Sequence, residues 1–275
     1  MKSLKTSARW RLLAIPAALA VAGAVTLTAT PAGNAAPASP AAAFTDDFDG
    51  PAGSPADGSK WNYETGDNVN NHEREWYTSG AANAALDGQG HLVITAKKES
   101  SGNNCWYGPC EYTSARLNTS GKFSTSSGHV EVRMKLPRGQ GMWPAFWMLG
   151  GGNWPTDGEI DVMENIGKEP NTVHGTIHGP GYSGANGIGA AYNGPNFSDD
   201  FHTYAVDWST NKIVWSVDGN AYETRTPADL NGNKWVYDHP FFLILNLAVG
   251  GDWPGDPDGG TQFPQQLVVD YVHVT

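Results

Sequence analysis

Charged residues are scarce in this chain, and positive charge is the scarcer kind. Charged side chains make up 16% of the 275 residues, with 17 Lys and Arg against 28 Asp and Glu and a formal net charge of -11. This balance repels phosphates and anionic headgroups, so we expect neither nucleic acid nor a membrane surface as a partner. Gly, Asn and Trp are plentiful instead. Together these features indicate a large binding surface that is polar but mostly uncharged.

Cysteine is nearly absent. Cys105 and Cys110 are the only two, and their C-x4-C spacing differs from the C-x-x-C of thiol redox centres. Two thiols alone also make a poor metal site. In an exported protein, a pair this close is expected to form a small disulfide loop. Such a bridge would fasten one surface loop and would say nothing about activity.

Long apolar runs are also absent, except at the N-terminus. Four basic residues precede the apolar run Leu12–Thr28, and small residues follow it, which is the order found in a signal peptide. An uncleaved membrane anchor is the alternative, because the run is almost long enough to span a bilayer. Pro16 and the Ala-rich end favour cleavage, which we place between Ala32 and Ala38.

The remaining chain is long enough for one large core. The sequence has no internal repeat, and its only Pro/Ala-rich linker precedes the folded part. We therefore expect a signal peptide at 1–36, a short linker at 37–43 and a single domain at 44–275. The mature protein should be soluble, secreted and monomeric.

Helix patterns are scarce, whereas strand patterns recur along the whole chain. In HVEVRMKLP, apolar residues alternate with polar ones from Val130 to Leu136, as in a strand with one wet face. KIVWSVDGNAYETRT reads as a hairpin that turns at Asp218-Gly219. FFLILNLAVGG is a continuous apolar run typical of a strand buried on both faces. Short strands with Gly, Asn, Asp and Pro turns predict an all-β, antiparallel sandwich of jelly-roll type.

Three carboxylates crowd one short segment, GEIDVMENIG, which contains Glu159, Asp161 and Glu164. Alternating acids on a strand often form only a solvated face, and hard oxygen ligands also suit calcium. The apolar residues between these acids argue against both readings. Because side chains alternate along a strand, Glu159 and Asp161 share a face and Glu164 should point away.

A β-bulge at 162–163 would bring Glu164 back to the face of the other two acids. The two glutamates would then be four strand steps apart, and their carboxyl groups could approach to roughly 5–6 Å, close to the ~5–5.5 Å of retaining glycosidases. Acids packed this closely cannot all ionise easily, so one should hold its proton to higher pH, as a general acid must.

The segment E-I-D-V-M-E resembles the E-x-D-x-x-E signature of glycoside hydrolase family 16, in its laminarinase-like (endo-1,3-β-glucanase) branch. The lichenase branch has E-x-D-x-E and so lacks the extra residue. The resemblance covers nearly the whole mature chain, through NVNNHEREWYT, YTSARLNTSGKFS, GQGMWPAFWML, TVHGTIHG and LNLAVGGDWPG. It implies a concanavalin-like jelly-roll sandwich with a substrate cleft on its concave face.

The resemblance also implies roles for the acids. Glu159 matches the nucleophile, Glu164 the general acid/base, and Asp161 the acid that hydrogen-bonds the nucleophile. The implied protein is a secreted retaining endo-β-1,3-glucanase acting on laminarin- or curdlan-type glucans, with no cofactor required for the chemistry. Three alternatives stay open: mixed-linkage 1,3-1,4-glucan as substrate, a galactan as substrate, or a non-catalytic, lectin-like glucan-binding module.

Further positions match substrate-binding residues of the family. They are Trp143, Trp147, His178, Arg116, Asn71 and Asn246, and a subsite role is also expected for Trp253 on the turn-rich loop GGDWPGDPDGG. Four other tryptophans are expected in the core: Trp61, Trp208, Trp215 and Trp235. The sequence assigns no role to Trp76, Trp106 or Trp154. Many relatives hold a structural calcium ion, for which the matching positions are Asp46, Gly90 and Asp270.

Overall fold

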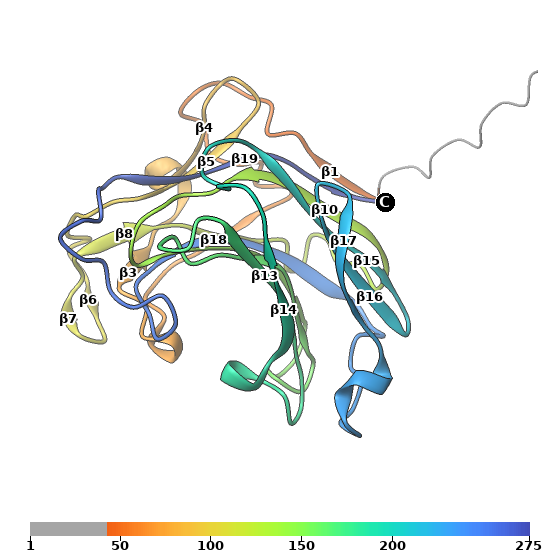
Figure 1. The fold of residues 1–275 in the computed structure, drawn as a ribbon. Helices are drawn as coiled ribbons and strands as arrows, with labels where there is room; N and C mark the ends of the chain where they lie inside the picture. Colours follow the sequence, from red (N-terminus) through yellow and green to blue (C-terminus); the bar gives the residue numbers. More distant parts are fainter. Residues whose placement is uncertain (1–42) are drawn as a thin grey trace, which may run out of the picture. The chain divides into compact units, whose positions relative to one another are not determined.

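The computed structural model describes residues 43–275, and its strands form two large antiparallel sheets (Figure 1). The predicted signal peptide and nearly all of the predicted linker lie outside the described residues. No helix among the described residues is long and apolar enough to cross a bilayer. The strands confirm the predicted all-β, antiparallel class.

The first sheet has seven strands and carries the acidic segment. Its strands, in spatial order, are β14 (Ile188–Asn193), β13 (Thr172–His178), β12 (Glu159–Glu164), β11 (Met142–Gly150), β18 (Phe241–Val249), β9 (Arg116–Asn118) and β2 (Asn62–Glu64). The predicted doubly buried strand is β18, an inner strand of this sheet between β11 and β9, and eight of its nine residues are buried. This burial explains its apolar run. One face of β18 lies against the core between the sheets, and loops and side chains cover the other face.

The second sheet packs against the first. Its strands, in spatial order, are β17 (Asn220–Arg225), β16 (Lys212–Val217), β15 (His202–Ser209), β10 (Gly128–Lys135), β19 (Gln265–Val274), β5 (Leu92–Ala96) and β4 (Ala84–Leu86), with β1 (Phe44–Asp46) paired to β19. Alternation in β10 buries Val130, Val132 and Met134 completely, as predicted. The hairpin predicted at Asp218-Gly219 joins β16 to β17.

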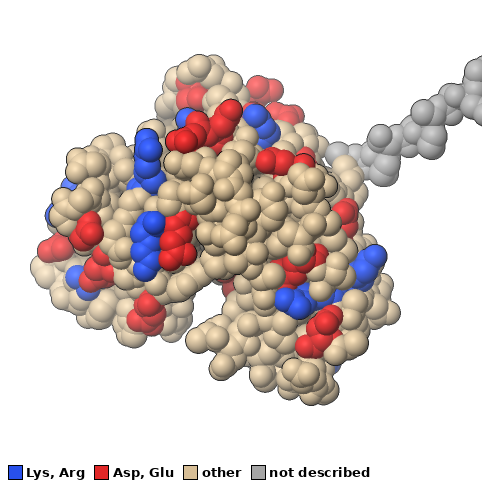
Figure 2. Space-filling view, in the orientation of Figure 1, with Lys and Arg blue, Asp and Glu red and all other residues tan. Residues whose placement is uncertain are grey.

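Smaller elements build out the rim of the domain. β3 (Glu75–Tyr77) pairs in parallel with β8 (Tyr112–Ser114), and β6 (Asn104–Cys105) pairs with β7 (Gly108–Pro109). The short 3-10 turns are η1 (Val69–Asn71), η2 (Gly80–Ala82), η3 (Gly184–Asn186) and η4 (Pro227–Leu230). Figure 2 shows the domain hollowed along one edge; in the matching view of Figure 1 the hollow lies between β6–β7 and β13–β14.

The core between the sheets holds three of the four tryptophans predicted to be there. Trp61, Trp208 and Trp215 are at most 3% exposed, whereas Trp235 is only partly buried and packs against the core from outside. The predicted disulfide between Cys105 and Cys110 is present. It closes the turn between β6 and β7, which Figure 1 shows at the edge of the domain.

Candidate active site

The predicted bulge is present in β12 and decides where the third acid points. Against β13, Asp161 pairs with Thr176 and Glu164 pairs with His174, so three residue steps on β12 match two on β13. The pairing with β11 shifts at the same place. The surplus residue cancels the alternation that would turn Glu164 away, so it shares a face with Glu159 and Asp161.

A bulge leaves backbone groups without ladder partners, and a core tryptophan satisfies one of them. Trp215, from β16 of the opposite sheet, donates its indole N–H to the carbonyl of Asp161 at 2.8 Å. Gly175 of β13 lies opposite the bulge and makes room for this ring, because a Cβ at Gly175 would stand 2.4 Å from Cδ1 of Trp215. The bulge is thus held from beneath by the second sheet.

Two tryptophans hold the two glutamates from opposite ends of β12. Trp143 donates its indole N–H to Oε1 of Glu164 at 2.9 Å, and Trp154 donates to Oε2 of Glu159 at 2.5 Å. Trp143 was predicted at the cleft, whereas Trp154 had no assigned role. Both hydrogen bonds favour the ionised form of the acceptor and fix the direction in which each carboxyl group points.

Burial and mutual repulsion shift the acid–base behaviour of the whole cluster. Loss of hydration raises the pKa of Glu159, and the neighbouring charge of Asp161 raises it further. Burial likewise raises the pKa of Glu164, with repulsion from Glu159 as the second cause. The pKa of Asp161 is raised well above its usual value by burial and then by Glu164. The three acids therefore hold their protons to higher pH than isolated carboxyl groups do, and they titrate as one set.

His178 stands at the Glu159 end of this cluster. Its Nε2 lies 3.0 Å from Oδ2 of Asp161, and its strand position pairs with Glu159. Glu159, Asp161 and His178 offer ligand atoms within 4.8 Å of one another, the arrangement of a candidate cation site. A cation there would compete with the protons that the raised pKa values of Glu159 and Asp161 retain on these carboxyl groups.

Each acid belongs to its own row of side chains, and these rows cross the seven-stranded sheet. Residues paired directly across neighbouring strands share a face of the sheet. One such row consists of Glu64, Arg116, Asn246, Ala145, Glu164 and His174. A second row places Trp147 beside Asp161. A polymer lying across the strands would therefore pass from Arg116 over the acids to the histidines.

Hydrogen bonds join the predicted binding residues of this face to one another. Asn246 is only 6% exposed: its Oδ1 accepts the indole N–H of Trp147, and its Nδ2 donates to the hydroxyl of Tyr77. Both ends of its amide are therefore engaged by protein side chains. Arg116 pairs with Glu64 at 3.0 Å and covers the ring of Trp147, with its guanidinium carbon 4.7 Å from the ring centre.

The loop after β18 forms a wall of the site beside Glu164. Trp253 is 40% exposed and meets the rings of Trp143 and His174 edge-on, with ring centres 5.7 Å and 4.9 Å away. Asn71 lies at the edge of this wall, where its carbonyl accepts the N–H of Asp252. Trp253 therefore contacts Trp143, the donor to Glu164, and the carbonyl of Asn71 lies beside Gly251, which also adjoins the ring of Trp143.

The three positions predicted for calcium are brought together only in part. Asp46 directs its carboxylate to the indole N–H of Trp61 and to Lys60, so that side chain is already engaged. Asp270 pairs with Arg133 and lies 4.0 Å from His91. Gly90 precedes His91, and its Cβ position would lie 3.8 Å from the carbonyl of Asp47. The Cβ position at Gly90 thus has two oxygens of the kind that calcium prefers beside it, the carbonyl of Asp47 and Oδ1 of Asp49, whereas Arg133 competes for Asp270.

Two features of the site had no sequence signal. Trp154 reaches Glu159 from a loop, and Trp106 reaches the backbone carbonyl of Glu73 at 2.7 Å across 33 positions of sequence. Both tryptophans are exposed, at 52% and 41%, although each indole N–H is held by a hydrogen bond. No pattern in the sequence indicated either partner.

The site has two glutamates on one face of a strand, and each accepts a hydrogen bond from a tryptophan. Further aromatic rings lie beside them. These features define a glycoside hydrolase of the two-carboxylate kind. Comparison with known families gives the same class, since residues 70–273 match the model of glycosyl hydrolases family 16. The chain therefore belongs to glycoside hydrolase family 16, and the fold is the jelly roll of that family.

Individual relatives agree in fold and sequence along most of the chain. A β-glucanase of Rhodothermus marinus is 42% identical over 249 residues, which span 84% of this chain and 83% of that protein. The laminarinase catalytic domain of Thermotoga maritima MSB8 superposes with a TM-score of 0.79 at 46% identity, covering 85% of this chain and 96% of that one. The endo-β-1,3-glucanase of Pyrococcus furiosus also gives 0.79, at 45% identity, with coverages of 85% and 93%.

Proposed function

We propose that this protein is a secreted, retaining endo-β-1,3-glucanase that cleaves internal bonds of laminarin- or curdlan-type glucans. The bulge at 162–163 carries the proposal, because it places Glu159 and Glu164 on one face with Asp161 between them. The branch of the family supports the substrate: the relatives named above are a β-glucanase, a laminarinase and an endo-β-1,3-glucanase.

In the first step Glu159 attacks the anomeric carbon of the glucosyl unit above it. Glu164 gives its proton to the glycosidic oxygen, so the leaving sugar departs as a neutral alcohol and a glucosyl-enzyme ester forms on Glu159. Glu159 has to be ionised for this step, and the N–H of Trp154 supports that form. Asp161 lies beside Glu159 on the same face, in a position to hold it toward the sugar.

In the second step Glu164, now ionised, takes a proton from water. The hydroxide equivalent attacks the anomeric carbon from the face that the leaving group vacated, the ester to Glu159 breaks, and Glu164 regains its proton. Two inversions give net retention. Trp143 donates to Glu164 in this ionised state, when the hydrogen bond is strongest.

The neutral cleft suits a neutral polysaccharide. Figure 2 shows mostly uncharged surface around the hollow, and the aromatic rings of Trp143, Trp147 and Trp253 offer planes for the C–H faces of sugar rings. Arg116 and Glu64, paired with each other at one end of the cleft, supply a donor and an acceptor for hydroxyl groups.

Two matched substitutions test the chemistry. Glu159→Gln and Glu164→Gln should each keep the fold, and each should lower laminarin hydrolysis by at least about 10²-fold. A β-glucoside with a dinitrophenolate leaving group should restore the first step in Glu164→Gln but not in Glu159→Gln, because that leaving group needs no proton. Glu169→Gln, an exposed acid five residues further on, is the control. Substantial laminarin hydrolysis by either active-site variant would refute the mechanism.

Substrate choice is tested by product profiles of the wild-type protein. We expect cleavage of laminarin and curdlan to exceed that of lichenan and agarose. Preferred cleavage of lichenan would assign the protein to mixed-linkage glucan, and preferred cleavage of agarose would assign it to a galactan. Binding of laminarin without release of reducing sugar would favour the lectin-like alternative.

We also propose export through the leader at 1–36, a monomeric mature protein, and a structural calcium ion near Gly90 and Asp270. The ion would bind backbone and carboxylate oxygens on the sheet that lacks the acids and would stabilise the fold without entering the reaction. A chelator should then lower Tm, and added calcium should restore it. An identical Tm in calcium and in chelator would contradict the proposal.

A further inference from the structure

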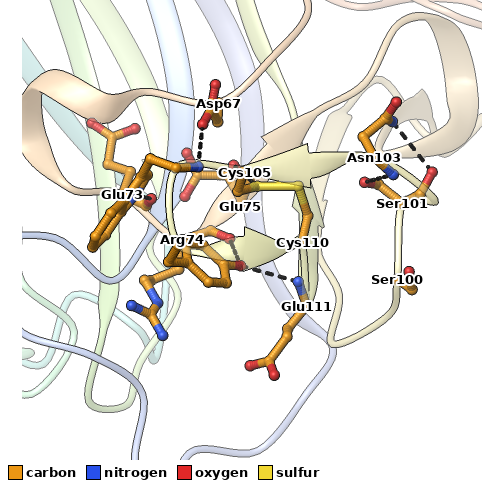
Figure 3. Close-up of a disulfide and its surroundings, with 12 residues drawn as sticks. Asp67, Glu73, Arg74, Glu75, Ser100, Ser101, Asn103, Cys105, Cys110 and Glu111 are labelled. Carbon is orange, nitrogen blue, oxygen red and sulfur yellow. Dashed lines mark hydrogen bonds between the residues drawn. A yellow bond between two sulfur atoms is a disulfide. The ribbon is translucent and has the colours of Figure 1, made fainter.

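The disulfide loop presents an aromatic plane that no step of the proposed reaction uses. Trp106 lies at the tip of the turn between β6 and β7, inside the ring closed by Cys105 and Cys110, and is 41% exposed. Its backbone N–H donates to Asp67 and its indole N–H donates to the carbonyl of Glu73, both at 2.7 Å (Figure 3). A large apolar side chain is thus held rigidly in an exposed position.

The neighbouring tyrosine fastens the loop to the rim of the cleft. The hydroxyl of Tyr107 donates to the carbonyl of Arg74 and accepts the N–H of Glu111 (Figure 3). The guanidinium of Arg74 lies 4.0 Å above the ring of Tyr107 and 5.5 Å from that of Trp106. The N–H of Arg74 donates to the carbonyl of Val249, at the end of β18. The loop is therefore tied to a strand of the catalytic sheet.

An open cavity of about 370 Å³ lies beside Trp106. It is lined by His72, Arg74, Trp106, Gly251, Asp252 and Asp256. This volume falls in the range of small-molecule sites. The opposite wall is the loop after β18, where His72 pairs with Asp252 at 3.0 Å.

The cavity is adjacent to the catalytic acids. Gly251, with φ +117°, lies against Trp143, since a Cβ on Gly251 would stand 3.2 Å from the indole ring. Trp143 in turn donates to Glu164. One indole ring therefore separates the cavity from the general acid, so a polymer bound at the acids can reach Trp106 with units beyond those next to the cleaved bond.

The lining favours a neutral, polyhydroxylated ligand. A cation would be repelled by Arg74, and a phosphate or carboxylate ligand would face both Asp252 and Asp256. A sugar ring avoids both conflicts, because its C–H face packs on Trp106 while its hydroxyl groups donate to the carboxylates and accept from the guanidinium.

We propose that Trp106, held by the Cys105–Cys110 disulfide, forms a distal glucosyl subsite that gives the protein its preference for long glucan chains. The identity of the sugar rests on the proposed function. The subsite itself leads to a separate prediction. Removing Trp106 should weaken the binding of long oligosaccharides and leave unchanged the binding of short ones that bind at the acids alone.

Oligosaccharide binding to a catalytically inactive variant tests the subsite separately from the proposed reaction. In Glu159→Gln, the Kd values of laminarihexaose and laminaritriose are measured by calorimetry, with and without Trp106→Ala. We expect the hexaose Kd to rise about 2- to 13-fold, as loss of one aromatic contact predicts, and the triose Kd to stay the same. Trp106→Phe, which keeps an aromatic plane, should retain most of the hexaose affinity.

The disulfide is tested in the same background. Cys105→Ser with Cys110→Ser should raise the hexaose Kd in the same direction as Trp106→Ala, because the plane is no longer held, and an unchanged triose Kd would show that the fold survives. Equal Kd values with and without Trp106 would overturn the proposal, and so would an equal loss for both sugars. If the wild type fails to hydrolyse laminarin while Trp106→Ala still weakens hexaose selectively, the proposed function fails and the subsite stands.

Discussion

Replacing the two tryptophans that donate to the glutamates should move opposite limbs of the pH–rate profile. Trp143→Phe keeps an aromatic ring but removes the N–H that donates to Glu164. Because that hydrogen bond favours the ionised carboxylate, its loss raises the pKa of Glu164 above the already raised wild-type value. Glu164 has to be protonated for the first step, so the basic limb should move to higher pH.

The size of the shift follows from hydrogen-bond energies. A hydrogen bond to a charged group contributes about 1.5–3 kcal/mol and one to a neutral group about 0.5–1.5 kcal/mol. The difference, about 1–1.5 kcal/mol, corresponds to about 0.7–1.1 pKa units at about 1.36 kcal/mol per unit. Trp154→Phe should raise the pKa of Glu159 and move the acidic limb upward instead. Its shift should be smaller, since Trp154 is 52% exposed and water replaces the lost donor.

The assay is kcat/KM on laminarin against pH, which reports the ionisations of the free enzyme. Trp235→Phe is the control, because that indole donates to Thr210 rather than to either glutamate. A shift of the acidic limb in Trp143→Phe and of the basic limb in Trp154→Phe would exchange the roles of Glu159 and Glu164. A downward shift of either limb would refute the electrostatic argument itself.

Two further predictions concern stability. Hydrogen bonds that the imidazolium of His129 donates to Glu131 and, to a lesser extent, to Asp207 raise the pKa of His129 to about 9 from 6.5. This stabilisation is fully present below about pH 6.5 and is lost as pH rises through 9, so His129→Gln should lower Tm at pH 6 and leave it unchanged at pH 10. Trp215→Ala should lower the free energy of unfolding by about 3–5 kcal/mol in urea titrations, because it empties a fully buried site. An unchanged urea midpoint would show that this ring is not the support of the bulge.

Much of the fold was predictable because strand patterns are local. The alternation in β10 and the apolar run of β18 follow from the two-residue period of a pleated strand and its burial on one face or two. The disulfide was predictable because two cysteines five positions apart, with no others in the chain, have only each other as partners.

The residues around the acids were less predictable, because their partners are distant in sequence. Trp215 had the features of a core residue, and nothing in its neighbourhood indicated that its N–H would serve a carbonyl 54 positions away. Asn246 was expected to contact substrate, yet its amide joins Trp147 to Tyr77. Such pairings depend on which strands become neighbours, and no local pattern records that order.

The sequence by itself determined that one strand carries three acids, with Glu159 and Asp161 on one face and an odd spacing that turns Glu164 away unless a bulge absorbs one residue. The strand pairing contains that bulge and returns Glu164 to the face of the other two acids. Only the tertiary structure decided what those acids can do. Burial raises the pKa of each, Trp143 and Trp154 direct the two glutamates, and the second sheet supports the bulge. Hydration and hydrogen bonding depend on every element packed around a group, so they are properties of the assembled fold.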